Sequence, residues 1–247
     1  MRAFLLVFIG AALAACSDDV PPAAGSADAD SLLAAARPEA FEAAFEALAA
    51  RDALVELAVT ERDASGAVVG EAAFRLQRTP AGTRVLRQSG TGTLEASPDS
   101  APRLGNPLDT ALPTDPPYTD PASRDQYRRD VLGDTTIGGR ALRRAEATLA
   151  NAEAEQGVRH VVAAVDPATG HPVLIEVDRA ANSAVYDEAS RVRVELADVA
   201  GTWLPRRILT DSRTDVPLAP PRRVRAEWTV LEVDGQPLGT AARGTGR

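Results

Sequence analysis

Cysteine and histidine, which often serve as nucleophiles, proton acceptors or metal ligands, occur three times in this sequence, as Cys16, His160 and His171. The two histidines lie in RHVVAAVDPATGHP, a pattern that predicts two strands joined by a turn. Five or six strand residues would separate them by roughly 15 to 20 Å, which is too far for them to share a metal ion. The chain also lacks a G-x-S-x-G elbow, an H-E-x-x-H pair and a glycine-rich phosphate loop. We therefore expect no catalytic residue, no metal and no cofactor, and hence no enzyme.

The single cysteine ends a run of small and apolar residues, MRAFLLVFIGAALAAC. The part from Ala3 to Ala15 has the length of a signal-peptide core, and it is shorter than the about 20 residues that span a bilayer. Its end, LAAC, resembles the lipobox of bacterial lipoproteins, in which the cysteine is acylated on sulfur and becomes the mature N-terminus. We therefore expect residues 1–15 to be a signal peptide and Cys16 to carry the lipid. The alternatives are an ordinary secretory signal with a chance cysteine, or a short buried helix.

The residues after Cys16 predict a flexible tether. Residues 16–30 are acidic, contain Pro21-Pro22 and Gly25-Ser26, and have no large apolar group. Several acyl chains would make a stable anchor, so we expect a lipid-anchored protein of the cell envelope, on the periplasmic side. By the enterobacterial sorting rule, Ser17 rather than aspartate directly after the cysteine favours the outer membrane.

Composition limits the possible partners. The net charge is −8 and all 27 basic residues are arginine. An acidic chain without a basic stripe argues against nucleic-acid binding, and its charge also argues against broad adsorption to anionic bilayers. We expect contact with the membrane through the acyl anchor, a lipid or a lipidated protein as ligand, and a monomer.

The periodicity of apolar residues predicts one helical segment followed by about nine or ten strands. Residues 31–51 are alanine-rich, with Phe41, Phe45 and Leu48 at helical spacing and Pro38 where a second helix would begin. From residue 52 the period becomes two, as in ALVELAVTER and EAAFRLQR. Residues 97–123 contain seven prolines and predict a long loop, after which strand patterns resume. We expect a single domain over residues 31–236 and a disordered tail over 237–247.

The order of these elements defines the expected fold class. No β-α-β alternation occurs, so a parallel sheet is not expected. We predict an α+β fold: a strongly curved antiparallel sheet, or incomplete barrel, covered by the N-terminal helix and the long loop. Such a geometry could leave a pocket under the cover.

Three stretches resemble the LolA/LolB lipoprotein-localisation superfamily. They are YRRDVLGDTTIGGRALRRAEATL, VVAAVDPATGHPVLIEVDR and GTWLPRRI. The resemblance implies an incomplete barrel closed by helices, with an apolar cavity that takes acyl chains. It also implies a role as a carrier or acceptor of lipidated proteins, or as a lipid-binding protein.

The candidate ligand cavity consists of apolar side chains on the predicted strands. These are Val55, Leu57, Val59, Phe74, Leu76, Val173, Ile175, Trp203 and Trp228. A filled core needs the same residue types, so a lipid cavity and a packed interior both stay open. Two arginine clusters, 206–207 and 222–225, could bind a phosphate or lipid headgroup, or could be water-facing residues of edge strands.

Two functional hypotheses follow. The first is a membrane-anchored envelope lipoprotein that binds acyl chains of lipids or lipidated proteins. The alternative is an anchored scaffold or sensor domain that binds a protein partner and has no lipid cavity.

Overall fold

One large antiparallel sheet organises the chain. The computed structural model describes residues 26–94, 105–151, 157–182, 187–217 and 219–238. Its strands are β1 (Ala53–Arg62), β2 (Val68–Thr79), β3 (Gly82–Gly92), β4 (Tyr127–Ile137), β5 (Arg140–Leu149), β6 (Gly157–Val165), β7 (Pro172–Asn182), β8 (Asp187–Val199), β9 (Thr202–Asp215), β10 (Arg222–Val233) and the short β11 (Gln236–Pro237). The predicted number of strands, nine or ten, was therefore nearly right.

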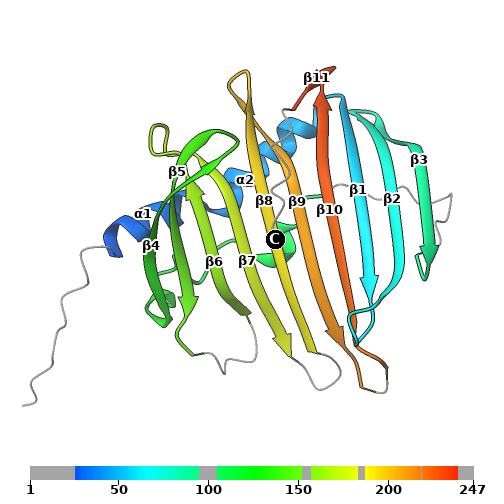
Figure 1. Ribbon diagram of the computed structural model, residues 1–247. Helices are drawn as coiled ribbons and strands as arrows, with labels where there is room; N and C mark the ends of the chain where they lie inside the picture. Colours follow the sequence, from blue (N-terminus) through cyan, green and yellow to red (C-terminus); the bar gives the residue numbers. More distant parts are fainter. Residues whose placement is uncertain (1–25, 95–104, 152–156, 183–186, 218, 239–247) are drawn as a thin grey trace, which may run out of the picture.

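The strand order shows that the sheet is an open half-barrel. It runs β3-β2-β1-β10-β9-β8-β7-β6-β5-β4, with β11 paired to β10 (Figure 1). Most neighbours are hairpins, but β1 pairs with β10, which is distant in sequence. The strands β3 and β4 follow one another in sequence yet lie at opposite edges, so the sheet is not closed. The predicted incomplete antiparallel barrel is confirmed.

Two N-terminal helices lie on one face of the sheet (Figure 1). They are α1 (Ser26–Ala35) and α2 (Pro38–Ala49), and Pro38 begins the second helix as predicted. The helix α2 buries Phe41, Phe45 and Leu48, the side chains that the helical spacing had indicated. Within the described part of the chain, no helix is long and apolar enough to cross a membrane.

The prediction of a tether over residues 16–30 was wrong for residues 26–30, which belong to α1. Asp28 lies in the first turn of this helix, where a negative charge is favourable, and Ala29 is fully buried. Arg143 donates a hydrogen bond to Asp28, and Arg129 donates one to Asp30. The acidic residues that suggested a solvated tether therefore attach the helix to the sheet. Residues 1–25, with Cys16, lie outside the described residues, so the signal peptide and lipid attachment stay predictions.

The proline-rich segment covers the sheet rather than forming an open loop. It contains a one-turn helix, α3 (Leu108–Ala111), and a 3₁₀ turn at Arg124–Gln126. Its apolar side chains Leu108, Leu112 and Tyr118 are buried in the core with the helices. The prediction that this loop covers the sheet agrees with this packing. The part of the loop before residue 105 lies outside the described residues.

Two further sequence predictions have different outcomes. The hairpin from His160 to Arg179 is confirmed as β6 and β7, and the Asp166 N–H donates to the His171 carbonyl across the turn. The prediction of a disordered tail over residues 237–247 was wrong for residues 237 and 238, and residues 239–247 lie outside the described residues. Pro237 pairs with Glu232, and Leu238 is buried and donates its N–H to Leu231.

Two tyrosines in the core provide a matched pair for a stability test. The Tyr118 ring packs edge-on against Tyr127, with 6.4 Å between ring centroids, and its buried hydroxyl has no hydrogen-bond partner among the described residues. The Tyr127 hydroxyl donates to the Val158 carbonyl at 2.7 Å. Burial raises the pKa of Tyr118, which keeps the phenol neutral.

We expect Tyr118→Phe to raise the free energy of unfolding by about 1 kcal/mol, because it removes a buried hydroxyl that makes no hydrogen bond. We expect Tyr127→Phe to lower it by a similar amount, because it leaves the Val158 carbonyl without its donor. Urea denaturation of both variants checks this. Equal destabilisation by the two changes would contradict the assignment of the unpaired hydroxyl.

Candidate functional site

The face of the sheet under the helices carries a continuous apolar row. Cross-strand partners share a face, so the registers align the side chains in the order Phe74, Leu57, Trp228, Ile208, Val194 and Ile175. Four of the predicted cavity residues therefore lie in one row across the sheet. We call this side the inner face and the opposite side the outer face.

The helical cover extends over only part of the inner face. Helix α1 contacts β4, β5 and β6, α3 contacts β7 and β8, and α2 contacts β9. Near the end of α2, Leu48 and Ala47 pack in a cluster with Val55 and Leu76 of the first two strands. In Figure 1 the helices lie behind the sheet, and β2 and β3 extend beyond them.

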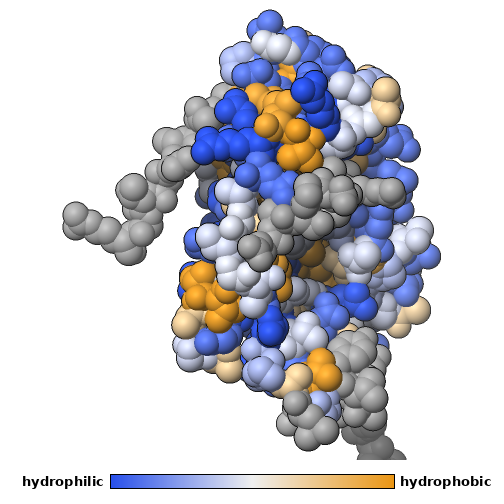
Figure 2. Space-filling view, turned by 90° about the vertical axis from the view of Figure 1, so that its right-hand side faces the viewer, coloured by the Kyte–Doolittle hydropathy of each residue, from blue (hydrophilic) through white to orange (hydrophobic). Residues whose placement is uncertain are grey.

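The predicted cavity residues differ in burial along this face. Val55, Leu76 and Ile175 are buried in packed clusters, and Leu57 is also buried. Val59, Phe74 and Trp228 are only half-buried. In Figure 2, which faces the β3 side, the middle of the molecule is hollowed and hydrophobic atoms are visible in its depth.

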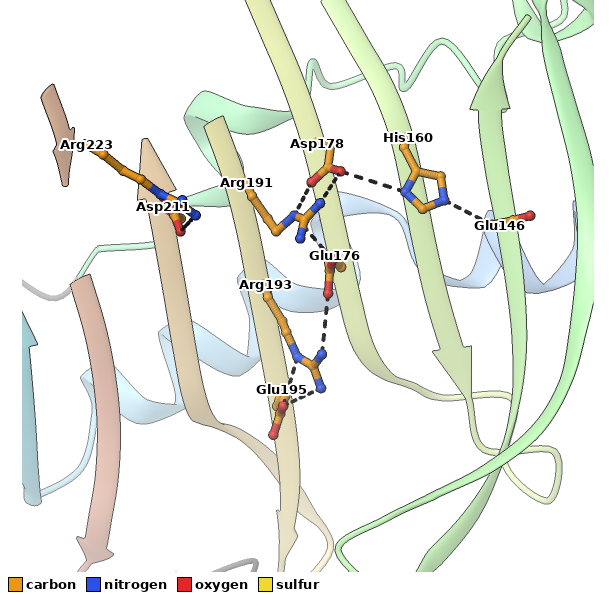
Figure 3. A network of polar contacts seen from close by, with 9 residues as sticks. All are labelled: Glu146, His160, Glu176, Asp178, Arg191, Arg193, Glu195, Asp211 and Arg223. Atoms are coloured by element: carbon orange, nitrogen blue, oxygen red, sulfur yellow. Dashed lines mark hydrogen bonds and ion pairs between the residues drawn. The ribbon is translucent and has the colours of Figure 1, made fainter. Parts of the chain in front are cut away.

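The outer face carries a ladder of alternating charges (Figure 3). Arg191 donates to both carboxylate oxygens of Asp178, at 2.6 and 2.8 Å, and Arg193 bridges Glu176 and Glu195. These partners stand opposite each other on β7 and β8, or along β8. Each charge in this ladder has a partner of opposite sign on the same or a neighbouring strand, so the charged side chains of the outer face stabilise one another.

His160 belongs to this ladder. Its Nε2 lies 3.0 Å from a Glu146 carboxylate oxygen, and its Nδ1 lies 3.9 Å from Asp178. It lies on β6, as the predicted strand around it indicated. Among the described residues, no group of three or more histidine, cysteine or acidic side chains is placed to hold a metal ion.

Glu195 is the buried carboxylate of the outer face, with only 4% of its surface exposed. Arg206 donates to one of its oxygens at 2.8 Å, and Arg193 donates to the other at 2.9 Å. Burial by itself raises the pKa of Glu195, but the hydrogen bonds and charges of the two arginines together outweigh it and hold the pKa below its usual value.

The two arginine clusters considered as headgroup sites are neutralised by carboxylates. Arg206 pairs with Glu195, Arg207 and Arg225 with Glu227, Arg222 with Glu61, and Arg223 with Asp211. Because each guanidinium already has an anionic partner, an added anion would have to displace a carboxylate. The alternative of water-facing residues agrees with the exposure of Arg207, Arg222, Arg223 and Arg225, but it was wrong for Arg206, whose side chain is only 13% exposed. The expectation of edge strands was also wrong, because β9 and β10 are each paired on both sides.

An open trough of about 1520 Å³ lies along the outer face, larger than the roughly 300 to 1,000 Å³ of a typical small-ligand pocket. Its floor comes from β1, β2, β3, β8, β9 and β10, and residues 136–140 of the β4–β5 turn form a wall. Gly138 of that turn (φ +60°) approaches the sheet so closely that a Cβ would lie 3.3 Å from the Arg206 guanidinium. Leu57 and Phe74 also lie along the trough, although strand alternation directs their side chains to the inner face.

Val173 and Trp203, the remaining predicted cavity residues, lie at one end of this trough. The Trp203 ring stacks on His171 with 4.4 Å between centroids, and the Arg140 guanidinium lies 4.8 Å from its centre. Arg140 in turn donates to Asp166 at 2.9 Å. Burial lowers the pKa of His171, which favours the neutral ring. The tryptophan is therefore a packed structural residue at the trough end.

Several residues of the outer face were not predicted as site residues. The alternating pattern RVRVEL places Arg191, Arg193 and Glu195 on one face, so this side could have been found from the sequence. The partners of these residues come from other strands, and the pairing of Arg140 with Asp166 depends on the curled β4–β5 turn. No local sequence signal identifies such contacts.

Comparison with known proteins gives no match in sequence. No protein-family model matches the chain, and no curated protein matches it.

Solved structures do resemble the chain. A LolA superfamily protein from Nitrosomonas europaea is 13% identical, with 89% of this chain and 96% of that chain covered and a TM-score of 0.27. A DUF1329 family protein from Desulfovibrio piger is 12% identical, with 88% and 95% covered and a TM-score of 0.28. A putative outer membrane lipoprotein-sorting protein domain from Vibrio parahaemolyticus is 12% identical, with 87% and 95% covered and a TM-score of 0.31.

These identities and TM-scores are too low to carry an argument about a ligand or a mechanism. The half-barrel architecture is established by the strand order and the helix positions of this chain.

Proposed function

We propose that this protein is a lipid-anchored protein of the cell envelope that binds acyl chains, of lipids or of lipidated proteins, on the inner face of its half-barrel. The observation that carries the proposal is the incomplete cover. The helices contact mainly β4 to β9, and only the end of α2 reaches β1 and β2, whereas Val59, Phe74 and Trp228, on β1, β2 and β10, are only half-buried. An apolar face of this kind would lose exposed surface when an acyl chain lies along it.

The energy available from such binding is sufficient for a reversible carrier. Each buried methylene contributes about 0.8 kcal/mol, so eight methylenes on this surface would contribute about 6 kcal/mol before ordering costs. The predicted acylation of Cys16 would keep the domain at a membrane, where such ligands are concentrated. Binding therefore needs no covalent chemistry.

Native mass spectrometry of the full chain carrying Cys16→Ser tests the proposal. The substitution removes the predicted acylation site, so any lipid mass is a bound ligand. We expect adducts of phospholipid or fatty-acid mass, reduced at least about tenfold by Phe74→Glu, because a buried charge beside an acyl chain is unfavourable.

Val216→Glu is the matched control, since Val216 is exposed and lies between β9 and β10. This variant should keep its adducts, and circular dichroism should show that both variants fold. If the measured mass is that of the protein alone, and no adduct forms after phospholipid or an acylated peptide is added, the acyl-binding proposal is wrong.

A further inference from the structure

Two arginines face each other across neighbouring strands near the far edge of the sheet. Arg75 of β2 stands directly opposite Arg87 of β3, and both side chains are exposed. In the part of the chain that the structure covers, neither has an ion pair or a hydrogen bond from its side chain. Like charges directly opposite on adjacent strands repel each other and destabilise the pairing.

Carboxylates do not neutralise this pair as they do the arginines of the charge ladder. Arg191 stands opposite Asp178 on one side and Asp211 on the other. Even Arg223, which stands opposite Arg62 and Arg213, pairs with Asp211. At Arg75 the register provides Glu56 on the β1 side, but no ion pair joins the two residues. Two arginines beside this one carboxylate leave a net positive charge here, in a chain whose net charge is −8.

Protection of a sheet edge accounts for only one member of the pair. Charged residues on an edge strand discourage pairing with other chains, which explains Arg87 on β3. Arg75 lies on β2, which is paired on both sides, so edge protection gives no reason for it. Its position opposite another arginine needs a different explanation.

Both arginines line the outer trough, together with Ser89 and Thr229, and the carboxylate of Glu56 lies between Thr229 and Arg75 in the cross-strand row. Two guanidinium groups beside hydroxyl side chains present many N–H and O–H donors to one space. Because guanidinium forks match the oxygens of a phosphate group, a phosphate would neutralise the repulsion and accept charge-assisted hydrogen bonds from both arginines.

We propose that Arg75 and Arg87 bind a phosphate group of a ligand that lies in the outer trough. This site is on the opposite face from the acyl-binding surface and goes beyond it. The phosphate can belong to a soluble phosphate ester or to a lipid headgroup, and the two sources give different results in the test below.

The test measures phosphate binding by the full chain carrying Cys16→Ser. Isothermal titration uses inorganic phosphate and glycerol 3-phosphate, and co-sedimentation uses vesicles of phosphatidylglycerol and, for comparison, phosphatidylcholine. We expect saturable binding that R75Q/R87Q weakens about 10- to 100-fold, the loss expected for charge-assisted hydrogen bonds. The control R37Q/R213Q removes two exposed arginines outside the trough and should leave the affinity unchanged.

The possible results distinguish a soluble phosphate ester from a lipid headgroup, and the phosphate site from the acyl-binding surface. Arginine-dependent binding of the soluble phosphates without vesicle binding supports a soluble ligand, and arginine-dependent binding of phosphatidylglycerol vesicles alone supports a headgroup. No binding of any probe, or an equal loss in R37Q/R213Q, would overturn the phosphate site. Acyl adducts in the same R75Q/R87Q protein should persist, so failure of this site and failure of the acyl-binding surface are distinguishable.

Discussion

Glu195→Gln is expected to lower the free energy of unfolding by about 3 kcal/mol. Glu195 is buried and accepts hydrogen bonds from Arg193 and Arg206, and the Arg206 side chain is only 13% exposed. The amide keeps the shape of the side chain but removes its charge, so the guanidinium of Arg206 stays in a poorly solvated position without an anion. Arg193 still has Glu176, so the loss is mainly at Arg206.

Urea denaturation checks this expectation, with Glu227→Gln as the control. Glu227 also pairs with an arginine, Arg207, on the outer face, but both side chains are partly exposed, and its loss should cost no more than about 1 kcal/mol. The double change Glu195→Leu with Arg206→Met should recover most of the stability, because replacing a whole buried pair by apolar groups is often neutral. Equal effects of E195Q and E227Q would contradict the role of burial.

The pH dependence of stability should change in the same variant. The folded-state pKa of Glu195 lies below its usual value of 4.5, so its contribution is present above pH 4.5 and is lost as the pH falls through the folded-state pKa. Between neutral pH and acid, the wild type should therefore lose more stability than E195Q. Parallel curves of unfolding free energy against pH for the two proteins would argue against a lowered pKa.

Phe41→Ala is expected to lower the free energy of unfolding by about 3 to 5 kcal/mol. Phe41 on α2 is fully buried, in a cluster that joins α1, the 105–126 segment and the inner face of the sheet. Removing the ring loses its transfer free energy and leaves a cavity at the point where the three parts of the cover meet the sheet. The variant therefore tests whether the cover and the sheet form one cooperative unit.

Glu42→Ala, at the next position on the exposed side of α2, is the control and should change the stability by less than about 0.5 kcal/mol. Urea denaturation followed by far-UV and near-UV circular dichroism gives the measurement, and the two probes should show coincident transitions. A loss of less than about 1 kcal/mol in F41A would mean that the helices contribute little to the stability of the fold.

Most of the secondary structure could be predicted, because its signals are local. Alternation in ALVELAVTER gives the strand β1 and also its two faces, since successive side chains of a strand point in opposite directions. Pro38 and the spacing of Phe41, Phe45 and Leu48 give α2 and its buried side. The acidic start of α1 was misinterpreted because Asp28 and Asp30 find their partners, Arg143 and Arg129, more than ninety residues away.

The candidate site was only partly predictable. Apolar periodicity selected Leu57, Phe74, Ile175 and Trp228, which the registers align in one row on the inner face. It gave no indication that the helices cover β4 to β9 and leave Phe74 and Trp228 half-buried, because that depends on where the cover lies on the sheet. For the same reason Val173 and Trp203, which lie at one end of the outer trough, were grouped with residues of the inner face.

By itself, the sequence determined the class of the fold, the inner and outer face of each strand, and the predicted anchor at Cys16, because each depends on neighbouring residues along the chain. Only the tertiary structure decided which strands pair across the sheet, and therefore which charges meet. The registers of β1, β2 and β3 place Glu56 on one side of Arg75 and Arg87 on the other, whereas the curled β4–β5 turn brings Arg140 to Asp166. Such contacts join residues from separate strands, so their energies depend on register and curvature that no short stretch of sequence contains.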